Sequence, residues 1–182
     1  MAIEISDDLR RGIGDLQSRL DKLKLPIKWE EPQKLHLTLN FLGRIEESLE
    51  PEIHRAIAKV CSLYAQFDLT PVFLETMYKK HEPSFLYLGI SGELPTLLQL
   101  QKNLREELLF LKVPLPEKFF AHITIGRVKK ADPITTKSVL NSIQDFEFSP
   151  LPDFTASAVS LFESLISDKG SHYRLIRRFM LK

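Results

Sequence analysis

The spacing of apolar residues along the chain predicts three long helices, each with one apolar face. Leu or Ile recurs every three or four positions over 7–23, and similar spacing returns over 49–64 and 95–111. The positions that form these faces are Leu9, Ile13, Leu16, Leu20, Leu23, Ile53, Ile57, Val60, Leu97, Leu100, Leu104, Leu108 and Leu111. A shorter helix is expected over 133–143.

The segments between these helices predict strands. They are short and contain alternating or continuous apolar residues, many of them β-branched or aromatic. The expected strands cover 1–5, 35–42, 67–78, 84–91, 119–128, 147–148, 155–164 and 173–181. Helices and strands are interspersed but do not alternate strictly, which indicates an α+β fold.

Two of these strands carry the same pattern of polar and apolar positions. His36-Leu37-Thr38-Leu39 and His122-Ile123-Thr124-Ile125 both read His-x-Thr-x, with an apolar residue at every x. Because side chains alternate between the faces of a strand, each string places its histidine and threonine on one face and its apolar pair on the other. The loops before the strings are also similar, with Pro32-Gln33-Lys34 before the first and Pro116-Glu117-Lys118 before the second. A duplicated unit would place the two strings about a pseudo-twofold axis, on either side of one cleft.

Composition and charge narrow the class of protein. The chain has 182 residues, is 43% hydrophobic and has a formal net charge of +1, so it lacks the strongly basic character of a protein that binds long duplexes. Its only cysteine, Cys61, excludes an internal disulfide and indicates a reducing compartment. Neither a secretory leader nor an apolar run long enough to span a membrane is evident, so we expect a cytoplasmic protein.

The two strings favour acid–base chemistry on a phosphate over other reactions. A metal site normally needs three or four ligands at close spacing, and neither strand offers a second ligand beside its histidine. The sequence contains neither the Gly-x-Ser-x-Gly turn of a serine hydrolase nor a glycine-rich phosphate loop. Two histidines across a phosphorus can act as general base and general acid, while two threonine hydroxyls donate hydrogen bonds to the phosphate oxygens.

Longer motifs around both strings resemble those of the 2H phosphoesterases, and among these the RNA 2′,3′-cyclic phosphodiesterases, also called 2′-5′ RNA ligases. The matching residues are Trp29-x-x-Pro32-x-x-Leu35-His36-Leu37-Thr38-Leu39-x-Phe41-Leu42-Gly43, Ala121-His122-Ile123-Thr124-Ile125-Gly126-Arg127, Phe162-Glu163-Ser164 and Gly170-x-x-Tyr173. The resemblance implies a duplicated, bilobal α+β fold in one domain over 1–182. Each lobe would contribute an antiparallel sheet to a central cleft, with helices outside.

The resemblance also implies an activity and its residues. His36 and His122 would be the acid–base pair, and Thr38, Thr124 and Arg127 would bind the phosphate. The reaction would be hydrolysis of RNA 2′,3′-cyclic phosphate ends to 2′-phosphates without metal or other cofactor, with reversible 2′-5′ ligation as a further activity. The partner would be an RNA or oligonucleotide with such an end, bound by a monomer away from any membrane. Two alternatives stay open, namely a non-catalytic module that binds nucleotides or RNA ends, and a 2H phosphodiesterase acting on another cyclic or oligonucleotide substrate.

One arginine and three aromatic residues outside the two strings are further candidates for the cleft. Strict alternation puts Arg127 on the face opposite His122, so it needs a bulge or a bent strand end to enter the cleft. Trp29, Phe41 and Tyr173 are aromatic residues that can stack on a base, although core packing is the commoner use of such side chains.

Overall fold

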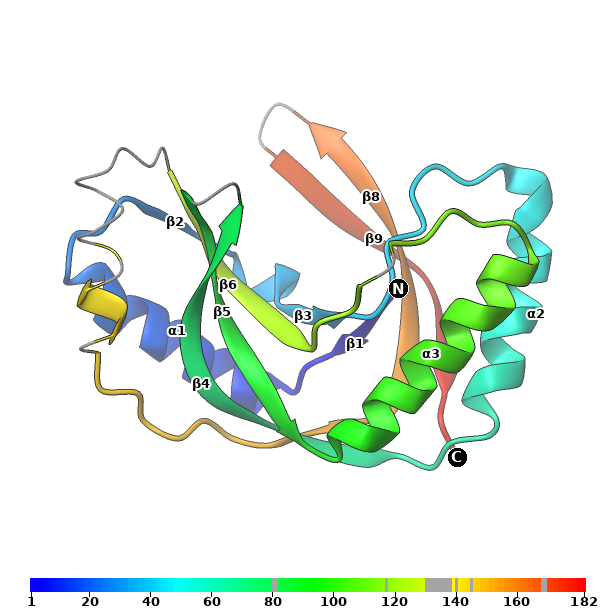
Figure 1. The fold of residues 1–182 in the computed structure, drawn as a ribbon, viewed down its shortest axis with the longest axis horizontal. Helices are drawn as coiled ribbons and strands as arrows, with labels where there is room; N and C mark the ends of the chain where they lie inside the picture. The colour runs from blue at the N-terminus through cyan, green and yellow to red at the C-terminus, as the bar shows by residue number, and fades with distance from the viewer. Residues whose placement is uncertain (80–81, 117, 130–138, 140, 145, 168–169) are drawn as a thin grey trace.

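The protein folds around one curved antiparallel sheet, seen in the computed structural model, which describes residues 1–79, 82–116, 118–129, 139, 141–144, 146–167 and 170–182. The strands follow the order β7-β4-β5-β6-β3-β1-β8-β9, and β2 also pairs with β6 (Figure 1). Their bounds are β1 Ala2–Glu4, β2 Ile27–Trp29, β3 His36–Thr38, β4 Phe67–Lys79, β5 Glu82–Gly92, β6 His122–Val128, β7 Phe154–Ala156, β8 Ala158–Ser167 and β9 Gly170–Met180. Both strings lie on central strands, on β3 and β6.

The pairing of β3 with β6 joins the two halves of the molecule. One half contains β4, β5, β6 and β7, and the other contains β1, β3, β8 and β9. The two sheets expected from the sequence form one continuous sheet, because Leu37 of β3 pairs with Ile123 of β6 where the halves meet. The α+β class and the antiparallel arrangement are confirmed.

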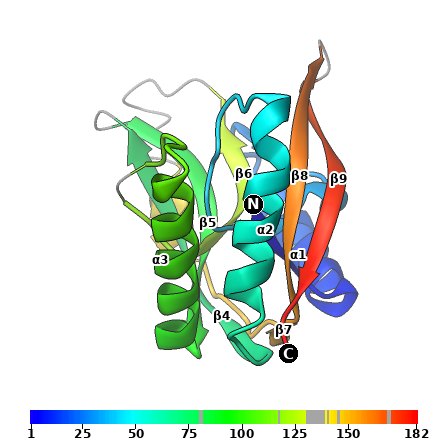
Figure 2. The same cartoon turned by 90° about the vertical axis from the view of Figure 1, so that its right-hand side faces the viewer.

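Three long helices flank this sheet. Helix α1 (Asp7–Asp21) lies behind β4, β5 and β6 in Figure 1, whereas α2 (Glu50–Cys61) and α3 (Leu94–Phe110) lie side by side in the other half (Figure 2). Ser6 caps α1 by accepting a hydrogen bond from the backbone N–H of Leu9, and two aspartates occupy its first turn, where the helix dipole favours negative charge. Short 3-10 turns at Pro32–Lys34 and Glu47–Leu49 lead into β3 and α2.

The apolar faces expected for the helices form the core. Leu9, Ile13 and Leu20 of α1 are fully buried, and so are four leucines of α3, namely Leu97, Leu100, Leu104 and Leu108. These side chains belong to one buried apolar cluster that includes residues of both halves. Cys61 is buried as well, and burial raises the pKa of its thiol to about 11.

Several local expectations need correction. Helix α1 ends at Asp21, so Leu23 lies beyond the apolar face and is 43% exposed. The strand expected over 147–148 is wrong, because this segment pairs with no strand of the described part of the chain. The strand expected over 155–164 is divided between β7 and β8. The strand over 35–42 shortens to β3. The helix expected over 133–143 falls largely outside the described residues.

Candidate active site

The register of β3 against β6 brings the two His-x-Thr-x strings together. Leu37 lies opposite Ile123 in an antiparallel pair, so the histidine of each string lies opposite the threonine of the other. The polar side chains project from the same face, with the two histidines on one diagonal and the two threonines on the other. Directly opposite Cβ atoms in such a pair are about 5 Å apart and diagonal ones about 7–8 Å apart. The four residues of this array are His36, Thr38, His122 and Thr124.

Matching hydrogen bonds orient the two imidazole rings. Nδ1 of His36 lies 2.7 Å from the carbonyl oxygen of Lys34, and Nδ1 of His122 lies 2.8 Å from that of Phe120. A carbonyl oxygen only accepts, so Nδ1 carries the hydrogen in both rings. In each neutral ring the lone pair is therefore on Nε2. Nε2 of His36 lies 2.9 Å from Oγ1 of Thr38, whose hydroxyl can donate to it.

Aromatic side chains surround both histidines and favour their neutral forms. Phe85 and Phe120 stack on the ring of His122, at centroid distances of 5.6 and 5.4 Å, and Tyr173 meets His36 edge-on at 5.4 Å. Burial lowers the pKa of both histidines, and in each case the hydrogen bond to the backbone carbonyl partly opposes that shift. A bound anion would favour protonation of either ring.

A β-bulge brings Arg127 to the face of β6 that carries His122. On β5, Leu86 pairs with Gly126 but the next residue, Tyr87, pairs with Thr124, which leaves Ile125 as an extra residue on β6. Alternation shifts at this point, because Ile125 and Gly126 are both buried and the next residue, Arg127, is exposed. The structure thus contains the bulge that Arg127 needs in order to point to the same side of β6 as His122.

Arg127 makes an ion pair at the edge of the cleft. Its Nε lies 2.7 Å from Oε1 of Glu30, the residue that follows β2. The arginine side chain is 60% exposed and the glutamate 21%, so the guanidinium still has donors available to a ligand. The negative charge of Glu30 also raises the pKa of His36, although burial outweighs it.

A cleft of about 360 Å³ covers the array, and His36, Thr38, His122, Thr124 and Arg127 all line it. A second cavity of about 880 Å³ continues from it between the segment after β3 and strands β8 and β9. Five residues line both, so the two cavities are parts of one cleft. They are His36, Thr38, Asn40, Phe41 and Tyr173.

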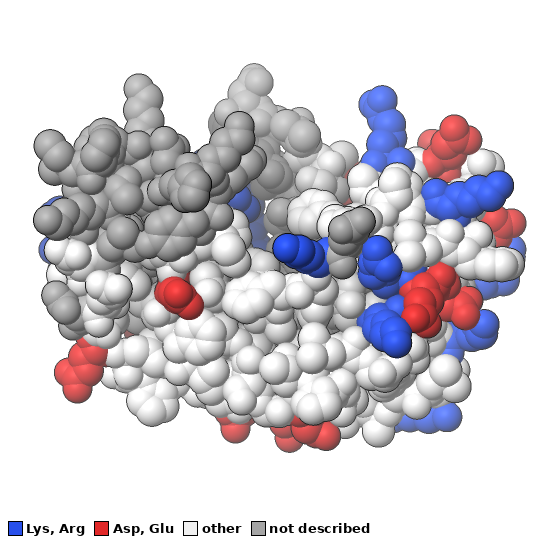
Figure 3. Space-filling view, in the orientation of Figure 1, with Lys and Arg blue, Asp and Glu red and all other residues white. Residues whose placement is uncertain are grey.

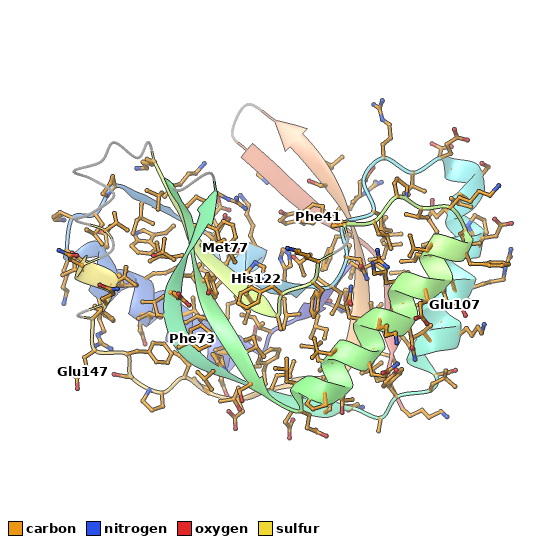
Figure 4. The ribbon with its side chains drawn as sticks, in the orientation of Figure 1. Phe41, Phe73, Met77, Glu107, His122 and Glu147 are labelled. Carbon is orange, nitrogen blue, oxygen red and sulfur yellow. The ribbon has the colours of Figure 1, made fainter. Side chains whose placement is uncertain are left out.

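The three candidate aromatic residues have different places. Phe41 is 62% exposed and Tyr173 36%, and both line the cleft, where Figure 4 shows Phe41 and His122 in the middle of the molecule. Trp29 instead packs against the core, and its Nε1 donates to Oδ1 of Asp21 at 2.9 Å. Phe41 and Tyr173 thus expose apolar surface in the cleft, whereas Trp29 packs against the core next to β6.

Charges outside the cleft are mixed in sign. Figure 3 shows acidic and basic side chains intermingled over α2 and α3, with few charged residues in the centre of that face. Two adjacent arginines, Arg177 and Arg178, lie on β9, and Arg178 forms an ion pair with Glu4.

Within the described ranges, no three His, Cys, Asp or Glu side chains cluster in a way that could hold a metal ion. No helix in the same ranges is long and apolar enough to cross a membrane.

Several residues of the site were not expected from the sequence. Phe85 and Phe120 contact His122, Glu30 binds Arg127, and Asn40 and Gln101 form a buried amide pair at the cleft wall, with Nε2 of Gln101 3.0 Å from Oδ1 of Asn40. Two features of the sequence could have pointed to such residues. They are the polar residues Gln17 and Gln101 on largely apolar helix faces and the aromatic residues near each string.

The sequence matches the family described as LigT like Phosphoesterase over residues 3–83 and 88–171. The chain therefore belongs to the LigT-like phosphoesterases, a family of 2H enzymes. Its relatives include an RNA 2′,3′-cyclic phosphodiesterase of Thermotoga maritima, 26% identical over 97% of this chain and 91% of that protein. A protein of the same name from Aquifex aeolicus is 27% identical, over 94% of this chain and 92% of its own length.

Solved structures share the fold. The protein TT0787 of Thermus thermophilus superposes with a TM-score of 0.80 at 22% identity, covering 99% of this chain and 95% of its own. E. coli LigT complexed with 3′-AMP superposes with a TM-score of 0.68 at 18% identity, over 99% of this chain and 94% of its own. These likenesses extend over both halves of the sheet.

Proposed function

We propose that this protein hydrolyses the 2′,3′-cyclic phosphate at the end of an RNA to a 2′-phosphate, using His36 and His122 as its acid–base pair and no metal ion. The main support is the Leu37–Ile123 register, which sets the two histidines diagonally across one face of the sheet. The names of the Thermotoga and Aquifex relatives support the choice of substrate. We also propose that residues 1–182 act as one catalytic unit and as a monomer, because the proposed catalytic and binding residues line one cleft of a single chain.

The reaction requires one proton to be removed and another to be delivered on opposite sides of the phosphorus. Nε2 of a neutral His122 accepts the proton of a water molecule as the water oxygen bonds to phosphorus. Nε2 of a protonated His36 donates its hydrogen to O3′ as the bond from phosphorus to O3′ breaks. The products are a 2′-phosphate and a 3′-hydroxyl, and proton exchange with solvent restores the starting charges of the two rings.

We assign the acid role to His36 and the base role to His122. The charge of Glu30 favours protonation of His36, although burial and the positive charge of the N-terminus lower the pKa of that ring. The phenyl groups of Phe85 and Phe120 both stack near His122, and burial lowers the pKa of that ring, which suits the base.

The other polar groups bind the phosphate. The hydroxyls of Thr38 and Thr124 lie on the second diagonal of the array, where each can donate to a non-bridging oxygen that gains charge in the transition state. Thr38 must then turn its hydrogen from His36 toward the phosphate. Arg127 adds a charge-assisted hydrogen bond from the edge of the cleft. A 5′-hydroxyl in place of water would produce a 2′–5′ phosphodiester, which is the ligation reaction.

The proposal is tested with a short RNA that ends in a 2′,3′-cyclic phosphate, incubated with the purified protein in EDTA. Chromatography identifies the new terminus, and His36→Ala and His122→Ala are compared with the wild type. His54→Gln is a matched control, because His54 lies on α2 against Phe179 and outside the cleft.

We expect a 2′-phosphate from the wild type and from His54→Gln, and at least a roughly hundredfold loss of rate in each catalytic variant. Full activity in either alanine variant would overturn the two-histidine mechanism. RNA that binds but keeps its cyclic end would favour the binding module, and cleavage of a different cyclic or oligonucleotide substrate would favour another 2H activity.

A further inference from the structure

Strand β6 changes its pairing partner at Ile125. Before that point β6 pairs with β3, through Leu37 and Ile123. After it, β6 pairs with β2, where Trp29 lies opposite Gly126. The carbonyl of Ile125 lies between these two pairings, on the same residue that forms the bulge against β5. A carbonyl oxygen has two lone pairs, so the Ile125 carbonyl can accept from a side-chain donor in addition to the backbone N–H of Glu30.

Gln17 supplies that donor from α1. Its Nε2 lies 2.8 Å from the carbonyl oxygen of Ile125 and 2.9 Å from that of Glu30, so both hydrogens of the amide are used. The backbone N–H of Glu30 also donates to the Ile125 carbonyl, at 3.0 Å. Gln17 is 8% exposed and shares its helix face with buried leucine and isoleucine residues. One buried amide thus ties the bulge of β6 to the residue that follows β2.

Ile125 and Glu30, whose carbonyls accept from Gln17, are both connected to Arg127, the arginine proposed to bind the phosphate. Arg127 follows Ile125 by two residues, and the bulge alone determines that its side chain faces the cleft. The carboxylate that holds its Nε at 2.7 Å belongs to Glu30, the other residue bound by Gln17. Both the backbone and the side-chain partner of Arg127 are therefore fixed by the same amide.

We propose that Gln17 is a positioning residue for substrate binding, which acts through the bulge and Glu30 to hold the Arg127 guanidinium toward the phosphate. The inference rests on the proposed function, because it takes the phosphate ester as the ligand of Arg127. A side chain that only filled space on this face of α1 would be apolar like its neighbours, since burying an amide is favourable only when its hydrogen bonds are made.

The test substitutes Gln17→Met, which keeps an unbranched side chain of similar size but removes both hydrogen bonds. If Arg127 contributes equally in the ground and transition states, KM for the cyclic-phosphate RNA should rise about tenfold while kcat changes less than about twofold. The same substitution in an Arg127→Ala background should change KM less than about twofold, because the residue through which Gln17 acts is already absent.

Two further measurements separate this role from a general loss of stability. Val60→Ala on α2 removes methyl groups from the core away from the cleft, so it should lower the melting temperature but leave KM unchanged. Calorimetric titration with 2′-AMP measures binding of a phosphate monoester without turnover, and Gln17→Met should weaken it about tenfold.

The outcomes are distinct. If Gln17→Met binds 2′-AMP as tightly as wild type, or if its effect on KM multiplies with that of Arg127→Ala, Gln17 is structural only and the inference fails. If the wild type binds 2′-AMP through Arg127 and Gln17 but leaves the cyclic end intact, the proposed reaction fails while the positioning role of Gln17 stands.

Discussion

Two glycine-to-alanine substitutions should change the stability of this protein in opposite directions. A Cβ on Gly126, in β6, would lie 2.7 Å from Cγ2 of Ile27 and 3.0 Å from Cε3 of Trp29. Neither neighbour can move easily, because Ile27 is 5% exposed and Trp29 is held by its hydrogen bond to Asp21. Overpacking of this kind costs about 1–3 kcal/mol, which corresponds to a loss of about 2–12 °C in melting temperature for a chain of this size.

Gly14 is the matched control for this substitution. It lies within α1, and a Cβ there would have no atom within 4 Å. Alanine at this position should stabilise the helix by about 0.5–1 kcal/mol and raise the melting temperature by about 1–4 °C. Thermal unfolding followed by circular dichroism measures both variants under one set of conditions.

Gly126→Ala should also affect substrate binding. Relief of the overlap requires β2 to move away from β6, and Glu30 would move with β2 because it follows Trp29 directly. KM should then rise, whereas Gly14→Ala should bind substrate as the wild type does. A Gly126→Ala protein that melts at or above the wild-type temperature would refute the close packing of β2 on the bulge.

Four further predictions follow from the site and the core. In a pH–rate profile the maximum of kcat/KM should lie below about pH 6.5, because the active form of the histidine pair carries one proton and burial lowers the pKa of both His36 and His122. A maximum above about pH 7.5 would contradict this prediction. The free energy of unfolding should fall as the pH drops below about 6.5, because the histidines then bind protons more readily in the unfolded chain than in the folded protein. Chemical denaturation at several pH values should show a smaller fall for His36→Gln than for the wild type. Thr38→Ala and Thr124→Ala should each lower kcat in steady-state assays by about ten- to a thousandfold, while their melting temperatures stay near that of the wild type. A wild-type kcat in either variant would argue against a contact between that threonine and the phosphate. The buried Cys61 thiol, with its pKa raised to about 11, should react with alkylating reagents only in denaturant, as mass spectrometry can show.

The sequence predicts local features of the fold well where one periodic pattern covers a whole element. The apolar faces of the three helices give both their type and their buried side, because every turn repeats the same information. Leu23 shows the limit of this reasoning, since the apolar spacing continues there after the helix has ended at Asp21. The 147–148 segment shows another, because a strand requires a partner that composition does not specify.

The sequence names candidate residues for the site but does not predict their arrangement. The doubled strings identify the histidines and threonines, yet only the long-range pairing of Leu37 with Ile123 sets each histidine opposite the other string's threonine. Alternation indicated that Arg127 needs a bulge, but the position of the bulge depends on the change of partner of β6 from β3 to β2. Gln17 lies at the edge of a helix face, where sequence alone does not distinguish a solvated amide from one that binds two carbonyls.

The continuous sheet restricts how the two halves of the molecule move. In many enzymes with two lobes a hinge opens the cleft, and catalytic groups on different lobes meet only after closure. Here the two histidines lie on neighbouring strands, and separating the halves would break the backbone hydrogen bonds between β3 and β6. The distance between the two histidines is therefore set when the chain folds, and the cleft is already formed. If His36 and His122 act as the proposed acid–base pair, we expect turnover without a step of lobe closure.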